Sequence, residues 1–224
     1  HNIDGSRGSV MAQLQITRFG GVEVLQLANQ ELTAPAPGEV LLDVFYAAVN
    51  PVDAKTRAGL GWAAAQHKDN LPWTPGFDVC GLVQAVGSAV TDFAVGQRVC
   101  GMVFRGGAYA SQLLAVADDL LPVPEVISAE QAAALPLAGL TAWQGLFEHG
   151  QLQAGETVLI SAAAGGVGHI AVQLAKQAGA KVIASASASN HAFLRELGAD
   201  QVVDYHDNDA MAALKGQLDL VFDL

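Results

Sequence analysis

The chain has 224 residues, of which 51% are hydrophobic and 15% charged; a typical soluble protein has about 25% charged residues. A chain this apolar can bury a sizeable core, which excludes intrinsic disorder. Eleven basic against 22 acidic residues give a net charge of −11, so we expect no nucleic-acid partner. No apolar stretch is long enough to predict a membrane span, and the two cysteines, Cys80 and Cys100, favour a reduced, cytoplasmic protein.

The N-terminal half is expected to be mostly β-structure. Residues 1–10 are small and polar and precede Met11, and we expect them to be a leader; a disordered native N-terminus is the alternative. After Met11, apolar runs separated by turn residues predict strands at 22–27, 40–49, 81–86, 98–103 and 109–116. A polar loop is expected between residues 50 and 70. Short strands at this spacing favour a barrel-like β domain.

The pattern changes near Ser128. Ser128 and Gln131 form a capping-box pattern that opens an Ala-rich helix, Pro136 breaks this helix, and a second helix is expected over 137–148. Strands at 157–161, 181–186, 201–204 and 218–222 then alternate with helices at 167–177, 191–197 and 210–214. This alternation predicts a doubly wound parallel sheet.

A glycine-rich loop lies between the first strand of this sheet and the helix that follows it. Its residues fit the pattern A-x-G-x-x-G and are Ala163, Gly165, Gly166, Val167 and Gly168. Gly165 would let the backbone approach a pyrophosphate, and Gly168 would let the helix pack closely on the strand. We therefore predict dinucleotide binding; an ordinary tight turn is the alternative. No Gly-Lys-Ser/Thr follows, which excludes a triphosphate-binding loop of the Walker type.

The end of the second strand bears on which dinucleotide is bound. An NAD site usually places an acid there for the ribose hydroxyls, whereas this segment offers hydroxyl, amide and imidazole groups. We expect NADP(H), held through Ser185, Ser187, Asn190, His191 and Tyr205. A solvated helix cap is the alternative interpretation of the serines.

Three blocks of residues resemble a known family. They are Asn50-Pro51-Val52-Asp53, the glycine- and valine-rich stretch 75–99, and Leu135-Pro136 with Thr141-Ala142-Trp143. The chain from Met11 to Leu224 resembles zinc-independent medium-chain dehydrogenases/reductases of the quinone oxidoreductase group. The resemblance implies a GroES-like catalytic β-barrel at 11–133 and a Rossmann dinucleotide-binding domain at 134–224.

The resemblance also implies chemistry without a metal. The zinc branch of the family holds its catalytic zinc through a Cys at the position of Asn50 and a His-Glu pair at Phe77-Asp78, so no metal site is expected here. We expect hydride transfer from NADPH to a quinone or an α,β-unsaturated carbonyl. Asn50 is the candidate to hold the substrate oxygen, or only caps its turn. Tyr46 is a candidate proton donor that shares a strand face with Asn50, or only packs in the core, and Thr141 is the expected nicotinamide contact.

Two other functions remain open. One is a non-catalytic NADPH-binding protein, such as a redox sensor or a crystallin-like protein, and the other is an enoyl-thioester reductase. The sequence stops after the fourth strand of the Rossmann domain, whereas the family continues. We therefore expect an incomplete sheet with an exposed edge at Leu218–Phe222, weak cofactor binding and self-association. For the complete chain we expect a homodimer.

Overall fold

The computed structural model describes residues 10–224, and the chain divides into two compact units between Leu137 and Ala138. Most of the expected leader lies in residues 1–9, outside the described part of the chain. Its last residue, Val10, opens the first strand and pairs with Glu31.

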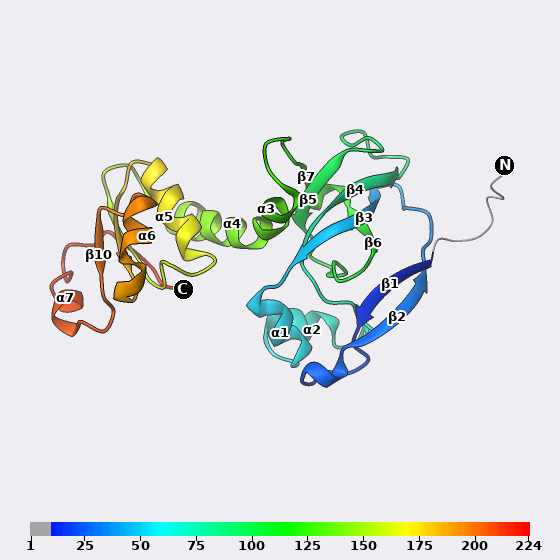
Figure 1. Ribbon diagram of the computed structural model, residues 1–224, viewed down its shortest axis with the longest axis horizontal. Helices are drawn as coiled ribbons and strands as arrows, with labels where there is room; N and C mark the ends of the chain where they lie inside the picture. The colour runs from blue at the N-terminus through cyan, green and yellow to red at the C-terminus, as the bar shows by residue number, and fades with distance from the viewer. Residues whose placement is uncertain (1–9) are drawn as a thin grey trace. The chain divides into compact units, whose positions relative to one another are not determined.

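The N-terminal unit contains two antiparallel sheets (Figure 1). The larger one has the strand order β6-β3-β4-β5-β7, and β1 pairs with β2 in the smaller one. The strands are β1 (Val10–Gln15), β2 (Gln26–Glu31), β3 (Glu39–Ala48), β4 (Asp78–Val86), β5 (Arg98–Met102), β6 (Gln112–Val116) and β7 (Leu120–Pro122). The inward-facing side chains of β3, β4 and β5, among them Leu42, Val83 and Val99, form the core of this unit. The expected β-rich N-terminal domain is confirmed.

Two expectations for this unit are wrong. Val22–Leu27 is not a strand: Val22–Val24 form a 3₁₀ turn that buries only Val24, and β2 begins at Gln26. The expected loop over 50–70 contains two helices, α1 (Pro51–Arg57) and α2 (Gly61–His67). Proline is favoured in the first helical turn, and the short apolar face of α2 is buried against other parts of the unit.

The region around Pro136 contains consecutive helices. Helix α3 (Ala129–Ala134) begins at the expected capping box, in which Ser128 Oγ accepts from the Gln131 N–H at 3.2 Å. Helix α4 (Pro136–Trp143) begins at the proline and continues as a π-helical segment, η3 (Gln144–His149).

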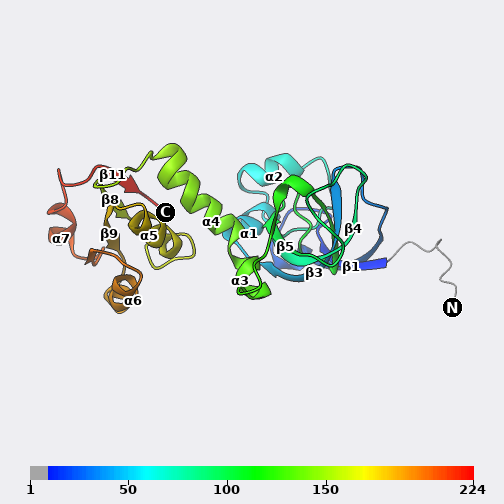
Figure 2. The same ribbon diagram turned by 90° about the horizontal axis from the view of Figure 1, so that it is seen from above.

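The C-terminal unit has a four-stranded parallel sheet in the order β10-β9-β8-β11. Its elements are β8 (Thr157–Ile160), α5 (Gly168–Gln177), β9 (Lys181–Ser185), α6 (His191–Glu196), β10 (Gln201–Val203), α7 (Asn208–Ala212) and β11 (Leu220–Phe222). Val158 and Ile160 belong to one buried cluster and Leu159 to another, so both faces of β8 are covered. Helix α5 packs against β8 and β9 (Figure 2). The predicted doubly wound sheet is confirmed, with the chain-order arrangement 3-2-1-4.

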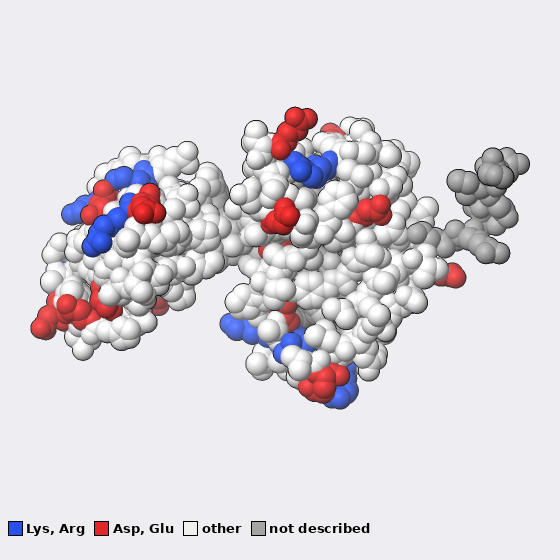
Figure 3. All heavy atoms as spheres, viewed as in Figure 1, with Lys and Arg blue, Asp and Glu red and all other residues white. Residues whose placement is uncertain are grey.

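The surface carries charges of both signs. On the face in Figure 3, Lys and Arg side chains lie among Asp and Glu side chains rather than in a continuous basic stripe. Within residues 10–224, no helix is long and apolar enough to cross a membrane.

Candidate functional site

A buried polar network in the N-terminal unit includes the candidate residue Asn50. Asn50 lies between β3 and α1, and the register that pairs Ala48 with Asp78 brings the start of β4 beside it. The Asn50 amide donates from Nδ2 to Asp78 Oδ2 at 2.9 Å. The other carboxylate oxygen of Asp78 accepts from the Leu137 N–H at 2.8 Å. Asp78 therefore fixes the orientation of the Asn50 side chain.

A second buried carboxylate, Asp53, continues this network. Its Oδ2 accepts from the Asn50 backbone N–H at 2.7 Å and from the Tyr109 hydroxyl at 2.9 Å. Its Oδ1 accepts from the Gly76 N–H at 3.2 Å. Gly76 has φ +98°, and a Cβ there would lie 2.8 Å from the Tyr109 nitrogen, so only glycine allows this close approach.

Burial dominates the electrostatics of the network. It raises the pKa of Asp78 from 3.8 to about 6, and the charge of Asp53 adds to the increase. Burial also raises the pKa of Asp53, against the hydrogen bonds that it accepts. The pKa of Tyr109 is raised by burial and by the neighbouring Asp53. Perturbed carboxyl pKa values often mark functional sites. No role was predicted from the sequence for Asp53, Asp78 or Tyr109.

Tyr46 is not part of this hydrogen-bonded network. Tyr46 is 45% exposed, and a hydrogen bond to Glu130, just inside α3, raises the pKa of the Tyr46 hydroxyl. Because β3 ends at Ala48, strand alternation does not extend to Asn50, and the argument that places Tyr46 and Asn50 on one face no longer applies.

The residues at the family's zinc positions do not fit a catalytic zinc. Phe77 is fully buried, and its ring centroid lies 5.9 Å from those of Trp62 and Trp73. The amide of Asn50 is bound to Asp78. Within residues 10–224, no three His, Cys, Asp or Glu side chains are grouped so that they could hold a metal ion.

In the C-terminal unit, the glycine loop joins β8 to α5 as expected. A Cβ on Gly168 would lie 2.7 Å from Ala163 Cα and would also clash with the Ala162 carbonyl, so glycine is needed where α5 packs on the loop. A Cβ on Gly165 would meet only the Ala162 oxygen, at 3.1 Å, and one on Gly166 would meet nothing within 4 Å. The structure therefore leaves open space at Gly166, whereas a side chain at Gly165 would press on the Ala162 carbonyl.

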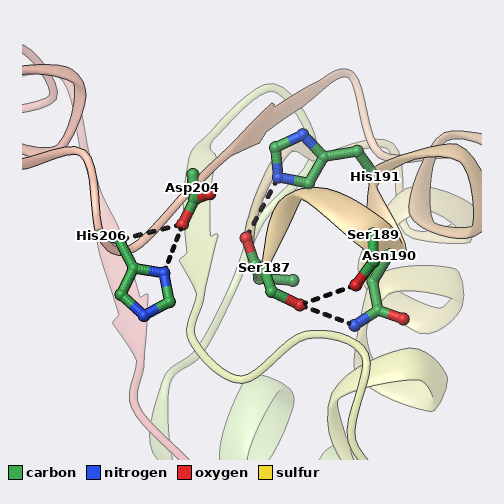
Figure 4. Close-up of polar contacts among 7 residues, drawn as sticks. Ser187, Ser189, Asn190, His191, Asp204 and His206 are labelled. Carbon is green, nitrogen blue, oxygen red and sulfur yellow. Dashed lines mark hydrogen bonds and ion pairs between the residues drawn. The ribbon is translucent and has the colours of Figure 1, made fainter.

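The ends of β9 and β10 carry most of the other expected cofactor residues (Figure 4). Ser187 Oγ lies 3.2 Å from Ser189 Oγ and accepts from Asn190 Nδ2 at 3.1 Å. His191 Nε2 lies 3.1 Å from the Ala186 carbonyl oxygen. Ser185, the last residue of β9, is buried, and its carbonyl accepts from the Ala163 N–H at 3.0 Å.

A carboxylate that the sequence analysis did not consider lies at this edge. Asp204 directly follows β10, and its Oδ1 is 2.9 Å from His206 Nδ1. Contacts with His206, together with the positive potential of His191, lower the pKa of Asp204. Tyr205 is half exposed, and its ring contacts that of His206 in a tilted arrangement, with centroids 4.0 Å apart. Thr141, the expected nicotinamide contact, lies on α4 and is exposed.

These features together define a class of protein. A β-rich domain followed by a parallel sheet with a glycine loop after its first strand is the architecture of a dinucleotide-dependent dehydrogenase. Two family models match the chain: the alcohol dehydrogenase GroES-like domain at residues 36–125 and the zinc-binding dehydrogenase at 166–224.

Similarity to individual proteins narrows the class of dehydrogenase to which the chain belongs. A quinone oxidoreductase from Coxiella burnetii is 41% identical, with a TM-score of 0.88 over 96% of this chain and 69% of that one. An Escherichia coli quinone oxidoreductase complexed with NADPH is 35% identical, with a TM-score of 0.80 over 91% and 61%. Mouse quinone oxidoreductase is 35% identical over 92% of this chain, which spans 62% of the mouse protein's length. The chain belongs to the medium-chain dehydrogenase/reductase family, in its quinone oxidoreductase-like group.

Proposed function

We propose that the complete protein is a cytoplasmic, homodimeric, NADPH-dependent oxidoreductase that reduces a quinone or an α,β-unsaturated carbonyl without zinc. In this proposal residues 11–133 are the catalytic domain and residues 134–224 belong to the dinucleotide-binding domain. The observation that carries it is the glycine turn at Gly165 and Gly166, open at Gly166 and placed after the carboxyl end of β8, in a chain related to quinone oxidoreductases.

The C-terminal unit supplies the residues proposed to hold NADPH. Backbone N–H groups of the glycine loop would bind the pyrophosphate, and Thr141 would contact the nicotinamide. The hydroxyls of Ser187 and Ser189 and the Asn190 amide would donate to the 2′-phosphate, with His191 and Tyr205 beside them; buried Ser185 would support them from below. Bound NADPH supplies a hydride, which the protein's own groups cannot provide.

The N-terminal unit supplies the residues proposed to act on the substrate. An amide nitrogen carries two N–H groups, and one N–H of Asn50 is bound by Asp78. The second would hold the substrate oxygen while negative charge develops on it. Tyr46 is the proposed proton donor, since its hydroxyl is protonated at neutral pH. The hydrogen bond to Glu130 raises the pKa of this hydroxyl and so makes it a weaker acid than a free tyrosine.

We propose that the protein works without zinc because of the residues that stand where the zinc branch of the family has its metal ligands. Phe77 has no metal-binding atom, and Asp78 already accepts two hydrogen bonds. Hydrogen bonds rather than a Lewis acid would then stabilise the charge on the substrate oxygen.

The proposal is tested first by fluorescence titration with NADPH and NADH. We expect NADPH to bind at least tenfold more tightly, a difference of about 1.4 kcal/mol, because no carboxylate lies at the end of β9. The variant Ser189→Asp should remove this preference, whereas Asp92→Asn, at a remote exposed acid, should keep it. Equal dissociation constants for the two cofactors in the unaltered chain would contradict the NADPH assignment.

Turnover then separates an enzyme from a non-catalytic binder. NADPH oxidation with a simple quinone is measured on the complete protein. We expect oxidation above the uncatalysed background, and lower turnover with an unchanged NADPH dissociation constant in Asn50→Ala. Tight NADPH binding without any oxidation would instead support the non-catalytic alternative.

A further inference from the structure

The two cysteines of the chain lie directly opposite each other in neighbouring strands. Cys80 of β4 pairs with Cys100 of β5 in antiparallel register. Backbone hydrogen bonds join Val103 to Phe77 and Val83 to Gln97 on either side of them. Bonded pairs alternate with non-bonded pairs along an antiparallel ladder, so the bonded positions on β4 are the odd-numbered ones. Cys80 and Cys100 therefore form a non-hydrogen-bonded pair.

This register suits a covalent cross-link. In a non-hydrogen-bonded pair the two Cα atoms lie about 4.5 Å apart, within the range of about 4.4–6.8 Å that disulfides span. The side chains also point to the same side of the sheet, because Cys80 clusters with Ala132 and Ala133 of α3 and Cys100 packs against this cluster. Cys80 is fully buried, whereas Cys100 is partly exposed.

We propose that Cys80 and Cys100 are a dithiol that a peroxide converts into a cross-strand disulfide. The Cys100 thiolate attacks one peroxide oxygen, the O–O bond breaks, and a sulfenic acid forms as hydroxide leaves and takes up a proton to become water. The Cys80 sulfur then attacks the Cys100 sulfur, the S–O bond breaks, and a second water leaves. Two thiols are oxidised, one hydrogen peroxide is reduced to two waters, and no other reactant is needed.

Burial and the neighbouring charges set the rate of this reaction, because they determine how much of each thiol is ionised. Burial raises the pKa of Cys80 to about 11, with Arg98 opposing and Glu130 adding to the increase. Burial and the Asp78 carboxylate raise the pKa of Cys100. The thiolate is the reactive form, so oxidation is slow at neutral pH and accelerates about tenfold per pH unit while the pH stays below the Cys100 pKa.

The test uses the folded 224-residue chain treated with hydrogen peroxide between pH 7 and pH 9. We expect both thiols to be lost together, the intact mass to fall by two hydrogen atoms, and the peptides that contain Cys80 and Cys100 to be linked until dithiothreitol is added. The oxidised chain should be monomeric on a non-reducing gel. Its urea midpoint should rise, because the cross-link closes the loop between the two strands.

Two single variants are the matched controls. In Cys100→Ala, the buried Cys80 should keep its thiol under the same treatment. In Cys80→Ala, the partly exposed Cys100 should gain oxygen atoms or link two chains, because no second thiol of its own chain is within reach. Oxygen addition to the cysteines of the unaltered chain without a linked peptide would overturn the proposal, as would two thiols that stay reduced while folded at pH 9 but react once the chain is unfolded.

Discussion

The variant Asp78→Asn tests whether burial of this carboxyl controls the stability of the N-terminal unit. Asp78 has no solvent exposure, and its pKa is raised from 3.8 to about 6. Asparagine keeps the shape of the side chain. The Asn50 amide can turn so that its oxygen accepts from the new amide group, while the remaining oxygen accepts from the Leu137 N–H. The substitution therefore removes the ionisation and keeps two hydrogen bonds.

The sign and size of the effect follow from linkage. Because the pKa is higher in the folded than in the unfolded chain, the folded chain binds the proton more tightly. The stability contributed by protonated Asp78 is complete below pH 3.8 and is lost as the pH rises towards 6. The full loss is about 3 kcal/mol, and about 1.4 kcal/mol of it falls between pH 5 and pH 7.5. Asp78→Asn should thus gain about 1.4 kcal/mol relative to the unaltered chain over this interval.

Urea unfolding followed by tryptophan fluorescence measures the effect, since two of the three tryptophans, Trp62 and Trp73, lie in the N-terminal unit. The pH interval stays above the pI of about 4.7, where solubility is poorest. Asp92→Asn, at an exposed acid of the same unit, is the control and should follow the unaltered chain. Parallel pH profiles for Asp78→Asn and the unaltered chain would refute the reasoning.

Two further predictions concern the proposed activity. Gly165→Val should abolish the fluorescence change on NADPH addition, because its side chain would stand over the turn to which the pyrophosphate is proposed to bind. Gly38→Val, at a glycine where an added Cβ would meet nothing within 4 Å, should bind normally, and normal binding by Gly165→Val would contradict the loop assignment. Tyr46→Phe should lower kcat for quinone reduction by about 100-fold or more without changing the cofactor dissociation constant. Glu130→Gln keeps the Tyr46 hydroxyl and should retain most of the activity. An unchanged kcat in Tyr46→Phe would contradict the role of this hydroxyl as proton donor.

The C-terminal unit was predictable because its signals are local. Each strand is a short apolar run, and glycines at positions 179 and 198 follow α5 and α6 with positive φ values of +85° and +105°. The expected bounds differ from the observed ones by no more than about three residues at most ends. By contrast, α1 was expected to be a loop although its start carries local helix signals, since Asn50 and Asp53 form a capping box and Pro51 stands at the first helical position. The Asp53 carboxylate is also held by Gly76 and Tyr109, which are distant in sequence, and no local pattern reports these two contacts.

The same limit applies to the candidate sites. The glycine loop is contiguous, so its residue types and spacing were enough to predict its position. Asp204 was not predicted because it follows the third strand, whereas the acid typical of an NAD site follows the second. In a parallel sheet the carboxyl ends of neighbouring strands lie at one edge, and this brings Asp204 close enough to His191 for their charges to interact.

Asp78 bears both on whether the chain can hold a catalytic zinc and on the proposed reduction chemistry. With a pKa of about 6 it is mostly ionised at pH 7, so its carboxylate can accept from both the Asn50 amide and the Leu137 N–H. A charged acceptor fixes the amide more strongly than a neutral one. The buried ring of Phe77 beside it offers no metal ligand. At the positions where the zinc branch of the family builds a metal site, this chain instead builds an amide held in one orientation, which is what a hydrogen bond to a developing oxyanion requires.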